Sequence, residues 1–139
     1  DDLVMVERFV AGTEVSVSVV DLGAGPVALP AVEIVPESGS FGYSERYTPG
    51  ETDYFVPARV SRETSELLAA NALAIFDALG LRHLSRIDFI VDEQENCWFL
   101  EANVTPGMTE TSLLPQAILA QGETLASAYS ALARVAFSG

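Results

Sequence analysis

The chain contains no lysine, and this absence excludes one common way of binding a nucleotide. All seven basic residues are arginine. A Walker-type phosphate loop ends its glycine-rich turn in a lysine, so that loop cannot be present. The single cysteine and single histidine, Cys97 and His83, permit neither an internal disulfide nor a complete Cys/His zinc site. Any metal that this chain holds is therefore expected to be a hard ion bound by oxygen atoms.

Long apolar runs and positive charge are also scarce. No stretch approaches the roughly 18 apolar residues of a membrane span, and the first residues do not resemble a secretory signal. Twenty acidic residues against seven basic ones give a net charge of -13, which repels nucleic acid and anionic lipid. We therefore expect a cytoplasmic location and partners that include neither nucleic acid nor a membrane. A length of 139 residues predicts one domain.

Hydrophobic periodicity predicts alternating strands and helices along most of the chain. The expected strands are residues 3–10, 14–20, 27–35, 84–92 and 97–103. The expected helices run from the N-cap Ser61 to the stop at Gly80, over residues 112–121 and over residues 124–137. Residues 37–57 show neither period, and their aromatic residues argue against simple disorder. We expect this stretch to form a long lid loop over a site.

Strands 84–92 and 97–103 form a predicted hairpin that brings acidic residues together. If residues 93–96 form the turn, Asp92 pairs with Cys97. Counting inward then puts Asp88 opposite Glu101, on a face of the second strand that also carries Phe99. The Cβ atoms of such cross-strand pairs lie roughly 4.5 to 5.5 Å apart.

The next pair of the same hairpin extends this polar face. Arg86 falls opposite Asn103, on the side of the sheet that carries Asp88 and Glu101. Two adjacent carboxylates repel each other unless one is protonated or a cation lies between them. Carboxylate and amide oxygens suit magnesium, which completes its shell with water and substrate phosphates. The pattern therefore favours a magnesium–nucleotide site on Asp88, Glu101 and Asn103.

The pattern alone also allows two different roles for the hairpin. Its polar face could be solvated, with Arg86 forming a salt bridge at the rim. The carboxylates could also act as a glycosidase-like acid and base, although the aromatic residues that would line a sugar cleft lie in the loop at 37–57.

Three stretches resemble the D-alanine:D-alanine ligases, which are ATP-grasp carboxylate–amine ligases. LSRIDFIVDEQENCWFLEANVTPGMTETSLLP resembles the C-terminal signature of the family, VERFVAGTEVSV its nucleotide-binding hairpin, and YSERYTPGETDYFVPA its active-site lid. The likeness covers nearly all of residues 1–139, as the C-terminal part of such a ligase. It implies an α+β, ATP-grasp-like domain, with a mainly antiparallel sheet packed against helices and a long lid loop.

The resemblance also implies a role for each matching residue. Two magnesium ions, or manganese in their place, would bridge the ATP phosphates and be held by Asp88, Glu101 and Asn103. Adenine would contact the segment with Glu7, Arg8 and Val10, and the ribose hydroxyls would contact Glu14. The oxyanion would be stabilised by Arg86 and the N–H of Gly107, and the carboxylate of the second D-alanine by Ser112 and Leu113. Arg46 and Tyr47 would close the lid.

The implied reaction is ATP-dependent joining of two D-alanines through an acyl phosphate, for peptidoglycan precursors. A homodimer would fit the family. Arg46 and Arg8 stand where the family usually has lysine, and Val104 where it has threonine or serine. The substrate domain and the lysine-bearing central domain are not in this sequence, so the fragment alone is expected to be inactive. Alternatives are a related ATP-grasp ligase for other amino or hydroxy acids and a non-catalytic nucleotide-binding module.

Overall fold

An antiparallel sheet organises the chain. The computed structural model describes residues 3–36 and 52–138. Within them the strand order is β4-β3-β1-β5-β6, and β2 pairs with β1 beside this path. The strands are β1 (Thr13–Asp21), β2 (Pro26–Ala28), β3 (Val32–Pro36), β4 (Thr52–Phe55), β5 (Leu84–Val91) and β6 (Cys97–Asn103). The long strands β1 and β5 lie at the centre, and β6 lies at one edge.

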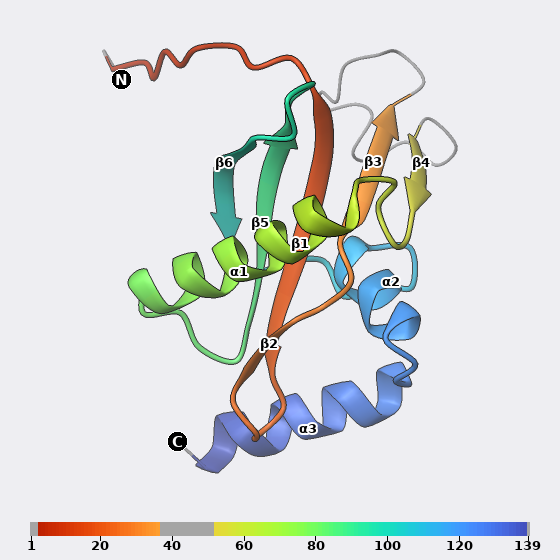
Figure 1. Ribbon diagram of the computed structural model, residues 1–139. Helices are drawn as coiled ribbons and strands as arrows, with labels where there is room; N and C mark the ends of the chain where they lie inside the picture. Colours follow the sequence, from red (N-terminus) through yellow and green to blue (C-terminus); the bar gives the residue numbers. More distant parts are fainter. Residues whose placement is uncertain (1–2, 37–51, 139) are drawn as a thin grey trace.

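Helix α1 (Arg62–Ala78) covers one face of the sheet, as Figure 1 shows. Its buried residues Leu68, Ala72 and Phe76 pack against alternate residues of β1 and β5. Ser61 is the N-cap, and its hydroxyl accepts a hydrogen bond from the N–H of Thr64, so the predicted helix start is confirmed. This face forms an apolar core that holds α1 on the sheet.

Helices α2 (Leu113–Ala120) and α3 (Leu125–Ser138) belong to a second core. Leu114 and Ile118 of α2 pack with Val20, Val32 and Ile34, which have the opposite parity along their strands from the residues beneath α1. The sheet is thus covered on both faces, and the predicted α+β class is confirmed.

Three predicted segments differ from the structure. Residues 3–10 form no strand, because no neighbouring strand offers them hydrogen bonds in the described part of the chain. The single strand expected at 27–35 is divided into β2 and β3 around Pro30, which cannot donate to a ladder. The loop expected at 37–57 contains β4, which pairs with β3, and residues 37–51 lie outside the described residues.

An ion pair between the buried Glu33 and the half-exposed Arg59 connects β3 to the segment before α1. The Glu33 side chain is only 7% exposed and accepts hydrogen bonds from Arg59 Nε at 2.9 Å and Nη2 at 2.7 Å. Arg59 also stacks over the Phe55 ring at 3.5 Å. The hydrogen bonds from Arg59 outweigh the effect of burial and lower the pKa of Glu33. Across residues 3–36 and 52–138, no helix has both the length and the hydropathy needed to cross a membrane.

Candidate functional site

Two rows of polar side chains cross the sheet on the face that α2 also covers. Ser16 of β1 pairs with Asp88 of β5, which pairs with Glu101 of β6. In the adjacent row, Ser18 pairs with Arg86 and Arg86 pairs with Asn103. The predicted pairings of Asp88 with Glu101 and of Arg86 with Asn103 are therefore confirmed. We call these six residues the polar rows.

Asp88 is the most enclosed carboxylate of the polar rows. Its side chain is 4% exposed and receives hydrogen bonds from Arg86 Nη2 at 2.8 Å and Nε at 3.0 Å. The hydroxyl of Ser16 donates to the same carboxylate at 2.8 Å. The other carboxylate, Glu101, is about half exposed and lies 3.7 Å from Arg86 Nη2. Arg86 is thus the cation that separates the two acids in this structure.

The charge of Arg86 is well supported by these neighbours. Burial disfavours the charged guanidinium, but the hydrogen bond to Asp88 and the negative charges of Asp88, Glu101 and Glu14 outweigh it. The pKa of Arg86 therefore lies above its ordinary value. A permanent positive charge with little solvent around it is suited to stabilise negative charge that develops on a bound molecule.

The predicted register is wrong for the residues nearest the turn, and a β-bulge restores it at the carboxylate pair. Asp92 does not pair with Cys97, because Val91 does, and the ladder then continues through Phe89 and Phe99 before it shifts next to Asp88. The shift leaves Leu100 as the extra residue, so the carboxylate pair has the predicted register after all. Phe99 consequently faces Phe89, with ring centroids 6.4 Å apart. The prediction that Phe99 shares a face with Glu101 is therefore wrong.

The donor set of the polar rows is chemically suited to magnesium. Asp88, Glu101 and Asn103 offer two carboxylates and one amide oxygen, and magnesium commonly uses one or two carboxylates. The Asn103 oxygen already accepts a hydrogen bond from the N–H of Thr105 at 2.9 Å, which fixes its orientation. The described residues contain no cluster of three or more His, Cys, Asp or Glu that could hold a metal ion. Since the polar rows offer only two acids and an amide, water and phosphate oxygens would have to complete the shell.

The loop after β6 brings Gly107 close to the start of α2. A Cβ atom on Gly107 would lie 2.6 Å from the Ser112 hydroxyl, so only glycine fits there without movement. Ser112 is the N-cap of α2, and its side chain makes no cap hydrogen bond but lies 2.8 Å from the Thr109 hydroxyl. Leu113 is buried in the second core, so its backbone N–H, and not its side chain, is available to a ligand.

Of the predicted nucleotide-binding residues, Glu14 lies close enough to the polar rows for its charge to act on Arg86, whereas residues 7–10 precede β1. Glu7 and Arg8 are exposed on the extended segment before β1, and Val10 is partly buried. Glu14 lies on β1 and has Ile34 and Ile90 as cross-strand partners. The predicted lid residues Arg46 and Tyr47 lie outside the described residues, so their position stays a prediction.

Two features of this region do not follow from the sequence reasoning. Ser16 is missed there, although serines at 16 and 18 alternate with valines and so mark one polar face of β1. Trp98 is predicted only to face away from the acids. In the structure it donates from Nε1 to Asp92 Oδ2 at 2.8 Å and lies beneath Arg8.

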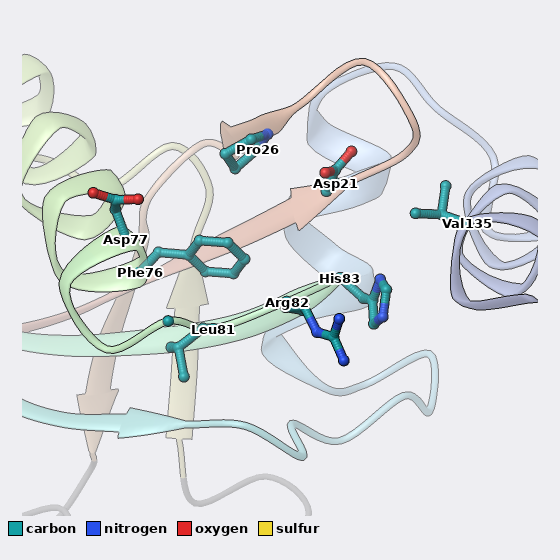
Figure 2. Close-up of a pocket in the computed structure, with 9 residues that line it drawn as sticks. Asp21, Pro26, Phe76, Asp77, Leu81, Arg82, His83 and Val135 are labelled. Carbon is teal, nitrogen blue, oxygen red and sulfur yellow. The ribbon is translucent and has the colours of Figure 1, made fainter. Parts of the chain in front are cut away.

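A separate pocket of about 580 Å³ lies at the C-terminal ends of β1 and α1. Figure 2 shows Arg82 and His83 along one side and Phe76 at the centre. The carboxylate of Asp21 already accepts hydrogen bonds from the N–H groups of Gly23 and Gly25. The pocket contains none of the predicted site residues, and we assign no ligand to it.

Solved structures share this arrangement of sheet and helices. A D-alanine–D-alanine ligase from Bacillus anthracis superposes with a TM-score of 0.73 at 27% identity, covering 92% of this chain and 40% of that one. A D-Ala:D-Ser ligase from Enterococcus faecalis gives 0.74 at 28% identity, covering 90% and 36%. These likenesses place the chain in the class of ATP-grasp ligase C-terminal domains.

Sequence comparison identifies the family within that class. The model of the D-ala D-ala ligase C-terminus matches residues 1–132, so the chain belongs to this family. A D-alanine–D-alanine ligase from Pelotomaculum thermopropionicum is 43% identical over 122 residues, which cover 88% of this chain and 38% of the relative. The homologue from Bordetella petrii is 42% identical over 126 residues, covering 91% and 39%. The chain therefore spans less than half the length of these relatives.

Proposed function

We propose that this chain is the metal-, nucleotide- and acceptor-binding part of an ATP-dependent D-alanine:D-alanine ligase. The observation that carries the proposal is the pairing of Asp88 with Glu101 beside the buried, charged Arg86. Family membership supplies the substrate class, since the relatives are named for ligation of D-alanine. The cellular role would be cytoplasmic synthesis of a peptidoglycan precursor, by a protein that acts as a monomer or a homodimer.

The proposed reaction has two steps. The carboxylate of the first D-alanine takes the γ-phosphoryl group of ATP, giving an acyl phosphate and ADP. The amine of the second D-alanine then attacks the acyl carbon, a C–N bond forms, and inorganic phosphate leaves. Between these events the acyl oxygen carries negative charge, which Arg86 and the N–H of Gly107 stabilise.

The other residues bind and orient the substrates. Asp88, Glu101 and Asn103 would hold two magnesium ions, or manganese in their place, and the ions would supply positive charge for the ATP phosphates. Ser112 and the N–H of Leu113, at the positive end of α2, bind the carboxylate of the acceptor. Residues 7–10 and Glu14 bind the nucleoside. Arg46 and Tyr47 are assigned to the lid from the family resemblance.

The test uses the complete protein that carries this chain. We expect phosphate release that requires ATP, magnesium and D-alanine. Asp88→Asn should reduce the turnover at least about 100-fold, because it removes a metal-binding carboxylate. Glu93→Gln, an acid in the turn of the same hairpin, is the matched control and should leave turnover unchanged. Retention of the fold is checked by circular dichroism, because Asp88→Asn also removes the partner of Arg86.

Binding is tested separately from turnover. The double variant Asp88→Asn, Glu101→Gln should weaken the affinity for magnesium–ATP in calorimetry, and an unchanged affinity would contradict the metal assignment. The D-Ala:D-Ser neighbour makes D-serine a specific second candidate for the acceptor. Phosphate release is therefore compared with D-alanine, D-serine, L-alanine and D-lactate plus D-alanine. Release with an acid other than D-alanine would move the assignment to another ligase of the class, and silence throughout would favour a non-catalytic module.

A further inference from the structure

Arg8 stacks on Trp98, a residue to which the proposed function gives no role. The guanidinium carbon lies 5.1 Å from the centre of the indole ring, within the range of a cation–π interaction. Trp98 is the only tryptophan of the chain and lies on the edge strand β6, three residues before Glu101. The stack therefore joins the segment before β1 to the strand that carries a proposed metal ligand.

The indole ring is fixed by the turn that precedes it. Trp98 donates from Nε1 to Asp92, and Asp92 also accepts hydrogen bonds from the backbone N–H groups of Gln94 and Asn96 at 3.0 and 2.9 Å. Glu95 of the same turn accepts from the Ser61 hydroxyl at 2.9 Å, at the start of α1. Hydrogen bonds of the turn therefore hold the indole ring in place, and the turn itself is hydrogen-bonded to the start of α1.

The segment that Arg8 belongs to has few other attachments. Its residues Leu3, Val4, Met5, Val6 and Phe9 are all between 83% and 93% exposed. Gly12 lets the segment enter the sheet close to β5, since a Cβ there would lie 2.3 Å from the carbonyl oxygen of Val91. Figure 1 shows the segment extending away from the sheet toward the N-terminus. A side-chain anchor at Arg8 therefore limits where residues 7–10 can lie.

An arginine at position 8 suits this contact better than a lysine would. A guanidinium is planar and weakly hydrated, so it stacks flat on an aromatic ring, whereas an ammonium is a compact and strongly hydrated charge. A stacked Arg8 has its charge engaged on β6, so the backbone of the segment is what remains for a nucleotide.

We propose that Trp98, held by Asp92, is a positioning residue that anchors Arg8 and so places the backbone of residues 7–10 for the nucleotide. The inference rests on the proposed function, in which this segment contacts adenine. It assigns the Arg8 side chain to an anchor on the protein and not to a direct contact with the ATP phosphates.

A double-mutant cycle on the complete protein tests this inference. The variants are Arg8→Lys, Trp98→Leu and their combination, and the readouts are KM for ATP, kcat and calorimetric ATP affinity. We expect each single variant to weaken ATP binding about two- to fivefold with kcat nearly unchanged. The double variant should be no weaker than Trp98→Leu alone. Trp98→Phe retains an aromatic face but loses the hydrogen bond to Asp92, so it should bind ATP more tightly than Trp98→Leu and less tightly than wild type.

Phe99→Leu provides the matched control, because Phe99 is the next residue of β6 and comparably exposed but faces Phe89. It should leave ATP affinity unchanged. Additive effects of Arg8→Lys and Trp98→Leu would overturn the inference and favour a direct contact between Arg8 and phosphate. Equal losses in Phe99→Leu would overturn it in favour of general disruption of β6. If the wild type is active and Trp98→Leu binds ATP as tightly as the wild type does, this inference alone is overturned. If the wild type binds no ATP, the proposed function is overturned together with the inference.

Discussion

Three serines on β1 and β5 show how differently one residue type is used at buried positions. Ser16 donates its hydroxyl to Asp88 at 2.8 Å. Within the described structure, the hydroxyls of Ser18 and Ser85 are buried without a hydrogen-bond partner. Ser18 is one of the six residues of the polar rows. Ser85 lies on the opposite face of the sheet, where Val19 is its cross-strand partner. Leaving a buried hydroxyl unpaired costs about 1 to 3 kcal/mol, so these positions differ in what their removal should do.

We expect Ser85→Ala to raise the free energy of unfolding by about 1 kcal/mol, because it removes an unpaired polar group from an apolar face. Ser16→Ala should lower it by about 1 to 3 kcal/mol, since Asp88 loses a hydrogen bond. Chemical denaturation of the two variants beside wild type measures both changes. A destabilised Ser85→Ala would indicate a hydrogen bond, for instance to buried water, that the Ser85 hydroxyl makes in solution.

At individual positions, sequence reasoning reached the correct acidic pair by a premise that was wrong in one step. The pairing of Asp88 with Glu101 was counted from a pair of Asp92 with Cys97, whereas Val91 pairs with Cys97 and the bulge at Leu100 restores the register. The contacts of Ser16 and Trp98 were missed because they depend on a third strand beside β5 and on a turn carboxylate. Those partners are brought close by tertiary packing, which the spacing of residues does not encode.

Among the elements, the hairpin of β5 and β6 is stabilised by several hydrogen bonds that the Asp92 carboxylate accepts within the turn. The hydrogen bond from Trp98 is the strongest influence, outweighs desolvation, and with those from Asn96 and Gln94 lowers the pKa of Asp92 from 3.8 to about 2. The ionised carboxylate is therefore the form that the folded hairpin favours.

This pKa difference predicts how the stability of the hairpin depends on pH. A group whose pKa is lowered by folding stabilises the protein above its unfolded pKa, and that contribution disappears as the pH falls through the folded pKa. Wild type should therefore be more stable than Asp92→Asn at neutral pH, and the gap should close between about pH 4 and pH 2. Urea unfolding of both proteins across this range is the measurement. A gap that stays constant with pH would show that the charge of Asp92 is not what stabilises the turn.

Element boundaries were predicted well where one helix or hairpin carries its own signals. The N-cap Ser61 and the spacing of buried residues identify α1 without tertiary information. The error at residues 3–10 has a different origin, since an alternating pattern reports only that a strand is possible. A strand also needs a partner strand, and in the described structure this segment pairs with none, although β6 is an edge strand.

At the scale of the whole molecule, the exposed apolar segment before β1 stands out against a net charge of -13. Charge keeps most of the surface hydrated, whereas Leu3 to Val6 and Phe9 present apolar side chains to solvent. The chain covers about 38% of the length of its relative from Pelotomaculum.

We therefore expect the isolated 139-residue chain to release no phosphate from ATP in the presence of magnesium and D-alanine. It contains no lysine, and in the proposed function its polar rows contribute only part of the nucleotide site. A coupled phosphate assay checks this, with the complete protein as the positive control. Turnover by the isolated chain, lost in Asp88→Asn, would show that these residues suffice.

The bulge at Leu100 makes the hairpin tolerant of a change in turn length that a regular ladder would not tolerate. In a regular hairpin, adding or removing one residue in the turn would exchange the two faces of β6 and send Glu101 to the side of α1. Here one residue of β6 is already unpaired, and it lies between the turn and the acidic pair. Deleting one turn residue could be compensated by pairing Leu100, with Asp88 and Glu101 left in place. A turn that is one residue shorter is thus compatible with the same register of the acidic pair.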